Sequence, residues 1–199
     1  MDKPRQRRSS GPRTFDRDEA VEIAMRLFRR YGYEGVSIAD LTGAIGIAPP
    51  SLYAAFGSKA GLYREALDRY AALPGALEGM AGAETLEEAV SGLLEAAIRS
   101  VVTDERGCMI STGLVEGAPA QQDLARELRT RRQGLRGRIA AALRRWLSVE
   151  DADRLAAYLL AVQQGIAVQA RDGADEAELL HIRDEVMIGV AVRHRSPAA

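Results

Sequence analysis

Hydrophobic positions along the chain recur mainly at the three- and four-residue spacing of amphipathic helices. Ala20, Ile23, Ala24, Leu27 and Phe28 form one such apolar stripe, which predicts a helix from about residue 16 to residue 31. Runs of β-branched residues are short, so strands are poorly supported. Ala, Leu, Arg and Glu dominate, and all four are good helix formers. The pattern therefore predicts an all-α protein.

Two short helices are expected after the first one. Ser37 is placed to cap a helix that ends near Ile45, and Gly46 supplies the left-handed residue of a tight turn. The next helix is expected over residues 48–55, and a longer one, capped by Ser58, to about Leu73. A helix, then two short helices around a glycine turn, is the helix-turn-helix pattern, in which the second short helix can enter a DNA major groove.

Pro74, Gly75, Gly79 and Gly82 then interrupt the pattern and predict a domain boundary. Five further helices are expected, over residues 84–103, 108–116, 120–147, 149–171 and 175–193. The predicted organisation is a flexible basic arm over residues 1–13, a helix-turn-helix domain over residues 14–75 and a second helical domain over residues 76–199.

The total charge argues against a nucleic-acid partner, but its distribution does not. The chain has 27 Lys and Arg against 28 Asp and Glu, a net charge of −1 without the basic excess usual in DNA-binding proteins. Residues 1–13 alone carry +4 and residues 1–75 carry +3, whereas residues 76–199 carry −4. A basic beginning is therefore joined to an acidic remainder.

The chain offers little material for catalysis, metal binding or membrane insertion. Cys108 is its single cysteine, which excludes an internal disulfide and a cysteine-cluster metal site, and His181 and His194 are its two histidines. No phosphate-binding loop or dinucleotide fingerprint occurs. Residues 1–12 lack the apolar core of a signal peptide, and the most apolar stretch, residues 156–168, is too short to span a bilayer. We therefore expect a cytoplasmic protein that is no enzyme and needs no cofactor or metal.

The helix-turn-helix segment from Ser37 to Lys59 resembles the TetR family of bacterial transcriptional regulators. The resemblance covers roughly residues 15–70 and also includes Leu27-Phe28 and Tyr31-Gly32-Tyr33 upstream. The positions that match the family pattern within the segment are Ser37, Leu41, Gly46, Ile47, Leu52, Tyr53, Phe56, Ser58 and Lys59. Further along, Gly107-Cys108-Met109 resembles one branch of the family.

The resemblance implies a repressor that binds a palindromic operator as a homodimer and is released by a small, largely apolar effector; a TetR-like activator is the alternative. It also implies that Ser37, Tyr53 and Lys59 contact DNA phosphates, for which a hydroxyl, a phenol and an ammonium are suited. The candidate DNA-binding residues outside the arm are Ser37, Thr42, Pro49, Pro50, Ser51, Tyr53 and Lys59.

The start of the second short helix departs from the family. Where members often have Ser-Lys-Gly followed by Thr or Ser, this chain has Ala48-Pro49-Pro50-Ser51, with no Arg, Asn or Gln for a bidentate base contact. We therefore infer that Arg5, Arg7, Arg8 and Arg13 of the arm contact phosphates or the minor groove. The alternative is that the arm is a solubilising tail.

In the second domain, the resemblance implies an effector pocket and a dimer interface made by the last two long helices. Candidate pocket residues are Cys108, Met109, Leu114, Trp146, Tyr158, Gln163 and Gln164. Candidate interface residues are Leu155, Leu159, Val162, Ile166, Leu179, Ile182, Val186 and Val190. For both sets, ordinary intramolecular core is the alternative.

Cys108 supports a second hypothesis about regulation. It follows Arg106, whose charge favours a reactive thiolate, so the residue is a candidate sensor of electrophiles or oxidants. A small, buried, unreactive cysteine is the alternative.

Overall fold

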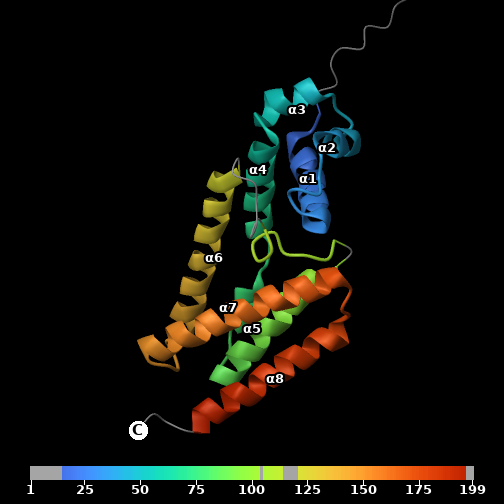
Figure 1. The fold of residues 1–199 in the computed structure, drawn as a ribbon. Helices are drawn as coiled ribbons and strands as arrows, with labels where there is room; N and C mark the ends of the chain where they lie inside the picture. The colour runs from blue at the N-terminus through green and yellow to red at the C-terminus, as the bar shows by residue number, and fades with distance from the viewer. Residues whose placement is uncertain (1–14, 104, 114–120, 196–199) are drawn as a thin grey trace, which may run out of the picture.

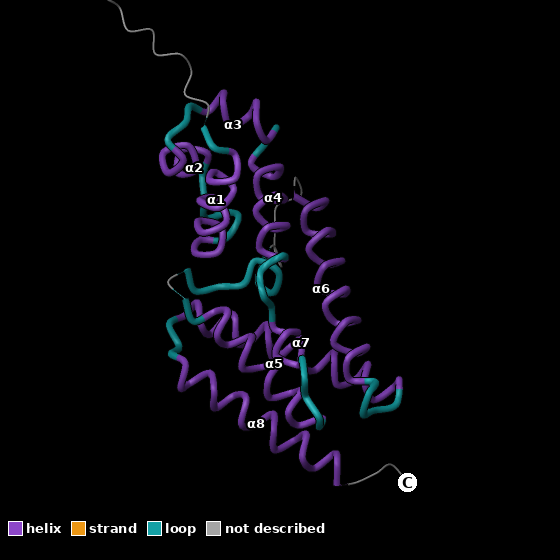
Figure 2. The backbone as a smooth tube through the Cα atoms, turned by 180° about the vertical axis from the view of Figure 1, so that it is seen from behind, coloured by secondary structure: helices purple, strands orange, loops and turns teal. Residues whose placement is uncertain are grey.

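The computed structural model describes residues 15–103, 105–113 and 121–195, and it contains no strand over these residues (Figures 1 and 2). The α-helices are α1 (Arg17–Tyr31), α2 (Ile38–Ile45), α3 (Pro49–Phe56), α4 (Lys59–Ala71), α5 (Leu86–Val101), α6 (Gln122–Leu143), α7 (Val149–Asp172) and α8 (Glu176–Arg195); a 3-10 helix, η1 (Ala76–Met80), precedes α5. The all-α prediction is confirmed. None of these helices is both long and apolar enough to cross a bilayer.

Short-range chemistry sets the helix ends near the beginning of the chain. The Asp16 carboxylate accepts hydrogen bonds from the backbone N–H groups of Asp18 and Glu19 and so caps α1. Gly32, at φ 74°, and Gly46, at φ 78°, end α1 and α2 in a region of backbone conformation that favours glycine. These ends agree with the sequence prediction because each depends on neighbouring residues alone.

The helix predicted over residues 108–116 is wrong for the part that the structure describes. Residues 107–113 form a looped segment, in which the Thr112 N–H donates to the Cys108 carbonyl. A Cβ at Gly107 would lie 2.7 Å from the carbonyl oxygen of Arg29, and a Cβ at Gly113 would lie 2.1 Å from that of Met109. A side chain at either position would therefore collide with a backbone carbonyl. The two glycines allow the chain to pass close to these carbonyls in a loop.

Two hydrophobic clusters form the core. The first is built from α1 to α4, with Phe28 edge-on to Tyr63 at a ring-centroid distance of 4.9 Å. Met109, Leu124 and Leu128, from much later in the chain, belong to this same cluster. The second cluster is built from α5 to α8. The first core is thus completed by residues beyond position 75, and the domain division predicted there stays a prediction.

The helices place α2 and α3 at one end of the molecule and α8 at the other (Figures 1 and 2). Between these ends, α4 runs toward α5, and α6 lies alongside α4 in both views. We call α1 to α4 the head, and α5 to α8 the body.

Candidate DNA-binding surface and effector cavity

A reciprocal pair of hydrogen bonds fixes the start of α2. The Ser37 hydroxyl accepts from the Asp40 N–H at 3.1 Å, while the Asp40 carboxylate accepts from the Ser37 N–H at 2.8 Å and from its hydroxyl at 2.6 Å. These bonds from Ser37 lower the pKa of the exposed Asp40 carboxyl. The Ser37 side chain is exposed and has a structural role as a cap, which is compatible with a phosphate contact.

Helix α3 has a buried face and a chemically sparse exposed face. Leu52 and Phe56 are buried in the first cluster, whereas Ser51 and Tyr53 are exposed, with Tyr53 at 48%. Pro49 and Pro50, also exposed, occupy the first two positions of the helix, where they contribute no N–H group. Hydrogen-bond donors on this end of α3 are therefore few, and the exposed Ser51 hydroxyl is one of them.

Thr42 is misplaced in the predicted DNA-binding set. Its side chain is 7% exposed, and its hydroxyl donates to the backbone carbonyls of Ile38 and Ala39. A threonine one turn into a helix commonly makes this bond, which removes its hydroxyl from any outside partner. Thr42 is thus part of the packing of α2.

Lys59, the first residue of α4, is partly turned toward the protein. Its ammonium lies 4.2 Å from the centroid of the Tyr33 ring, a cation–π geometry. Desolvation lowers the pKa of the ammonium, and the nearby Glu34 carboxylate acts in the opposite direction. A phosphate contact by Lys59 would extend or replace its contact with Tyr33.

Arg17 is a residue of the head that the sequence pattern did not reveal. Its guanidinium donates to the Ala55 carbonyl and to the Glu65 carboxylate, both at 2.6 Å, and lies 4.5 Å from the Phe56 ring centroid. It therefore braces the end of α3 against α1 and α4. No local pattern indicates this role, because Ala55 is 38 residues away in the sequence.

The arm arginines Arg5, Arg7, Arg8 and Arg13 lie outside the described residues. Their charge still matters for the surface described above, because residues 14–75 carry seven basic and eight acidic side chains, a net charge of −1. All of the positive excess of residues 1–75 therefore comes from the arm.

A cavity of about 520 Å³ lies where the head meets the body. Its lining comes from α1, the end of α4, the segment that leads into η1, α5, the loop near residue 108, α6 and α7. Most lining residues are apolar, and the polar ones include Arg29, Tyr70, Cys108 and Gln163. Burial raises the pKa of the Tyr70 phenol, which also hydrogen-bonds to Cys108. This combination suits a mainly apolar small molecule with a few polar groups.

The structure brings together only two of the seven predicted pocket residues in this cavity, Cys108 and Gln163. Met109 lines a separate hollow of about 370 Å³ against α1 and Tyr63. The Trp146 indole N–H donates to the Glu84 carbonyl, away from the cavity lining. Two more are placed elsewhere, since Tyr158 is half exposed on the surface of α7 and Gln164 is outside the lining. The seventh, Leu114, lies outside the described residues.

Arg29 is the second residue that the sequence pattern did not reveal. It belongs to α1 but is only 8% exposed, and its guanidinium donates to the Ser100 carbonyl at 3.0 Å and to the Thr103 hydroxyl at 3.1 Å. Arg171 at the end of α7 donates in turn to the Arg29 carbonyl at 3.1 Å. Arg29 therefore makes a direct polar link between the head and two helices of the body.

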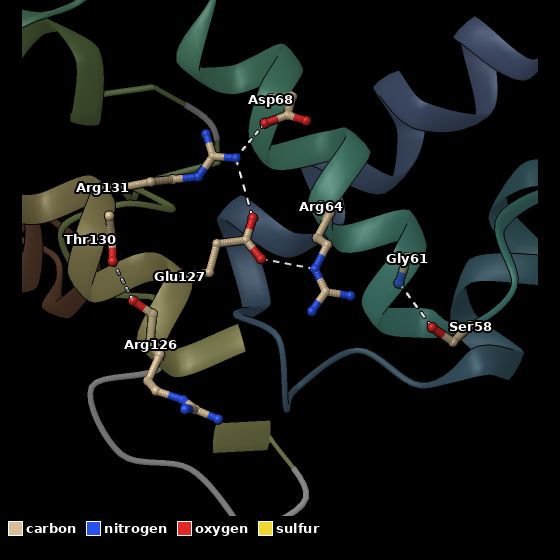
Figure 3. A network of polar contacts seen from close by, with 8 residues as sticks. All are labelled: Ser58, Gly61, Arg64, Asp68, Arg126, Glu127, Thr130 and Arg131. Atoms are coloured by element: carbon tan, nitrogen blue, oxygen red, sulfur yellow. Dashed lines mark hydrogen bonds and ion pairs between the residues drawn. The ribbon is translucent and has the colours of Figure 1, made fainter. Parts of the chain in front are cut away.

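Ion pairs make a further link, between α4 and α6 (Figure 3). The Glu127 carboxylate accepts from Arg64 at 2.8 Å and from Arg131 at 3.4 Å, and Arg131 also pairs with Asp68. These contacts fix the position of α4, whose first residue is Lys59, against the long helix α6.

Most residues of the predicted dimer interface are buried in the chain's own core and are not available to a partner. Six of its eight residues are 0–3% exposed and belong to the second cluster: Leu155, Leu159, Ile166, Leu179, Val186 and Val190. Val162 and Ile182 are partly buried against the same cluster. Large apolar side chains that do reach the surface of α7 and α8 are Val149, Tyr158, Val168, Ile188 and Val192, with exposures of 48–61%. The helical stripe is the chain's own core because α5 packs against it.

Comparisons with known proteins agree with this architecture. The family model described as "Bacterial regulatory proteins, tetR family" matches residues 21–66. The chain is 33% identical over 190 residues to the HTH-type transcriptional repressor ComR of Escherichia coli (strain K12), a match that covers 86% of this chain and 87% of ComR. It is 37% identical over 119 residues to the HTH-type transcriptional repressor BdcR of the same organism, covering 57% of this chain and 60% of BdcR.

Among solved structures, a cysteine mutant of the TetR family transcriptional regulator CifR in complex with 26-bp double-strand operator DNA has a TM-score of 0.80. The two chains are 36% identical, and the match covers 89% of this chain and 98% of the CifR chain. These relatives are transcriptional regulators rather than enzymes. The described fold and the extent of these matches show that the chain is a DNA-binding regulator and belongs to the TetR family of bacterial transcriptional regulators.

Proposed function

We propose that this regulator is a repressor that binds a palindromic operator as a homodimer and is released when a small, largely apolar molecule occupies the cavity between head and body. The observation that carries the proposal is the position of the cavity. Its lining includes Arg29 of α1 and Tyr70 of α4, so an occupant would touch the head itself. A molecule that favours another placement of the head would change the spacing of two recognition helices across a dimer.

The surface of α7 and α8 supports the homodimer. Tyr158 and Val168 on α7, and Ile188 and Val192 on α8, are large apolar side chains that remain about half exposed or more in a single chain. A two-fold interface uses one such patch twice. It would hold two α3 helices about 34 Å apart, one turn of DNA.

Changing Ile188 to Glu tests this interface. The charged side chain is expected to give a monomer by light scattering and to abolish tight operator binding, because each half-site alone binds weakly. Ala141→Glu adds the same charge at an exposed position on α6 and should remain a dimer. An Ile188→Glu protein that stays dimeric with unchanged operator binding would refute the proposed interface.

Selection of bound sequences from a random DNA pool tests the operator. We expect a palindrome with a fixed spacing between half-sites. Within such a site, Tyr53→Phe should weaken binding about tenfold through loss of one hydrogen bond to a phosphate, whereas Tyr31→Phe, at a similarly exposed tyrosine on α1, should not. Failure to enrich any sequence would contradict the repressor function.

The arm is proposed to supply phosphate contacts that α3 lacks. Removing residues 1–12 should flatten the dependence of log affinity on log salt by about 0.9 for each phosphate that the arm neutralises in the full chain. An unchanged slope would show that the arm is a solubilising tail.

A thiol-responsive regulator is the second candidate function. Cys108 is partly accessible, lines the cavity, and its sulfur accepts a hydrogen bond from the Ser111 N–H at 3.3 Å. A thiol in this place could couple its modification to the same head–body contacts. If Cys108→Ser responds normally to every inducer and oxidant, this candidate is excluded.

A further inference from the structure

Two side chains that line the cavity each contain a buried nitrogen atom with no hydrogen-bond partner among the described residues. These atoms are Nε of Arg29 and Nε2 of Gln163, on side chains that are 8% and 5% exposed. An unpaired buried donor is costly, because it has lost its hydrogen bonds to water without replacing them. The side chains of Arg29, on α1, and Gln163, on α7, thus both line one cavity, and each carries a buried donor that is not used.

The charge around Arg29 is also unbalanced. Its two shorter hydrogen bonds go to neutral acceptors, the Ser100 carbonyl and the Thr103 hydroxyl, while the Glu105 carboxylate lies 3.5 Å away. Desolvation acts to raise the pKa of Glu105, but hydrogen bonds, including one from Thr103, and the charge of Arg29 together lower it, so Glu105 is ionised. This ion pair, at 3.5 Å, is the one that Arg29 makes with the described residues, and it neutralises the buried guanidinium incompletely.

Among the residues that the structure describes, the other charged groups near the cavity do not restore this balance. Arg171 donates to the Arg29 backbone carbonyl and so adds a second positive charge nearby. Arg138 also belongs to the lining. Glu78, the acidic residue of the described lining, is exposed to solvent, which screens its charge. A cationic ligand would meet two arginines here, whereas an anionic one would complete their pairing.

We propose that the cavity binds an apolar organic acid, with its carboxylate held by Arg29 Nε and Gln163 Nε2. This inference rests on the proposed function and names the chemical class of its effector. Charge-assisted bonds to a desolvated arginine are among the strongest in proteins. The hydrocarbon part would lie against apolar lining residues, which include Leu73, Leu77, Val101, Leu135 and Ala167.

The same geometry explains how such an acid acts on the head. Arg29 is part of α1, and its guanidinium is the group that bonds to the end of α5. A carboxylate that draws this guanidinium competes with its bonds to Ser100 and Thr103, which changes the link between head and body. The effector is thus sensed by a residue of the DNA-binding domain itself.

Matched ligands test the proposal on the full chain. Decanoate and naphthoate are compared with their neutral amides and with decylamine, by calorimetric titration and by release of the selected operator in fluorescence anisotropy. The carboxylates are expected to bind about ten- to a hundredfold more tightly than the amides, and decylamine should not bind. Amides that bind as tightly as the acids would overturn the assignment.

Substitutions locate the binding site. Gln163→Met keeps the shape of the side chain but removes its donor, and should weaken decanoate binding about tenfold or more. Gln164→Met, at the neighbouring position outside the lining, should bind decanoate as the original chain does. Arg29→Met removes the positive charge and the Nε donor and should lose the preference for acids over amides. Undiminished decanoate binding by Gln163→Met would refute the site.

The two proposals fail in distinguishable ways. If the protein binds its operator but no carboxylate binds or releases it, the effector class is wrong while the repressor function stands. If no operator is found, the repressor function fails, and calorimetry still decides whether the cavity takes an organic acid.

Discussion

The exposed face of α3 and the lining of the cavity are opposites in chemistry. On α3, the outward side chains of the first turn are two prolines and a serine, with Tyr53 beyond them and no charged group. The cavity lining contains a buried arginine and a buried glutamine, each with a nitrogen that has no partner in the described part of the chain. The first region is well fixed and chemically sparse, whereas the second holds polar groups at a cost in stability.

This difference distinguishes DNA binding by α3 from ligand binding by the cavity. Helix α3 is positioned by its buried face, by the Gly46 turn before it and by the Arg17 brace, so its contribution to DNA binding depends on placement more than on side-chain reach. The cavity depends on the identity of a few polar atoms. Substitutions that disturb the position of α3 should therefore lower the stability of the head. Substitutions that remove polar groups from the cavity should raise stability and weaken the response to ligand.

The largest effect is expected from the buried side of α3. Leu52 is fully buried, so Leu52→Ala should lower the free energy of unfolding by about 2–5 kcal/mol through reduced burial and a residual cavity. Ala54→Ser, on the exposed side of the same helix, should change it by less than about 0.5 kcal/mol. Urea unfolding measures both. Equal losses in the two variants would contradict the two-faced description of α3.

The turn between α2 and α3 should give the next largest effect. Gly46 is left-handed and has open space around a would-be Cβ, so Gly46→Ala should cost about 1–2 kcal/mol from backbone strain alone. Gly43 lies inside α2 with equally open space, and Gly43→Ala should raise the unfolding free energy by up to about 1 kcal/mol. Because neither added methyl group meets another atom, thermal unfolding of the two variants measures the effect of backbone conformation alone. The change in unfolding free energy must have opposite signs in the two variants.

Gln163 gives the prediction that contrasts most directly with α3. Because its buried amide nitrogen has no partner among the described residues, Gln163→Met should stabilise the unliganded protein by about 1 kcal/mol even though it weakens the acid response. Gln164→Met, at a less buried position, should leave stability nearly unchanged. A clear loss of stability in Gln163→Met, measured in urea, would mean that the amide nitrogen has a partner after all.

The smallest effect concerns the ion pairs between α4 and α6 in Figure 3. Glu127→Gln removes pairs with Arg64 and Arg131, which are partly exposed, so the loss should be at most about 1 kcal/mol and should shrink as salt is added. Asp123→Asn breaks a pair that lies within α6 alone. If both variants change operator release to the same extent, the link between α4 and α6 has no part in it.

Much of the head could be predicted because its signals are local. The Ser37 cap, the Gly46 turn and the prolines at the start of α3 depend on residues within a few positions of one another, and the structure has them as expected. The body was predicted less well. Its helices were found with approximate ends, but the segment near residue 108 was wrongly expected to be helical, because the contacts of Gly107 with Arg29 and Arg171 are made by distant residues.

The sequence by itself determined the helical class, the helix-turn-helix segment, its family pattern and the uneven charge along the chain. Only the tertiary structure decided that the stripe on α7 and α8 is core, that Thr42 faces inward and that Arg29 joins Gln163 at one cavity. The physical reason is that periodicity shows that a helix has an apolar face but not what covers it. Arg29 and Arg171, for example, are 142 residues apart and meet only when the head packs on the body.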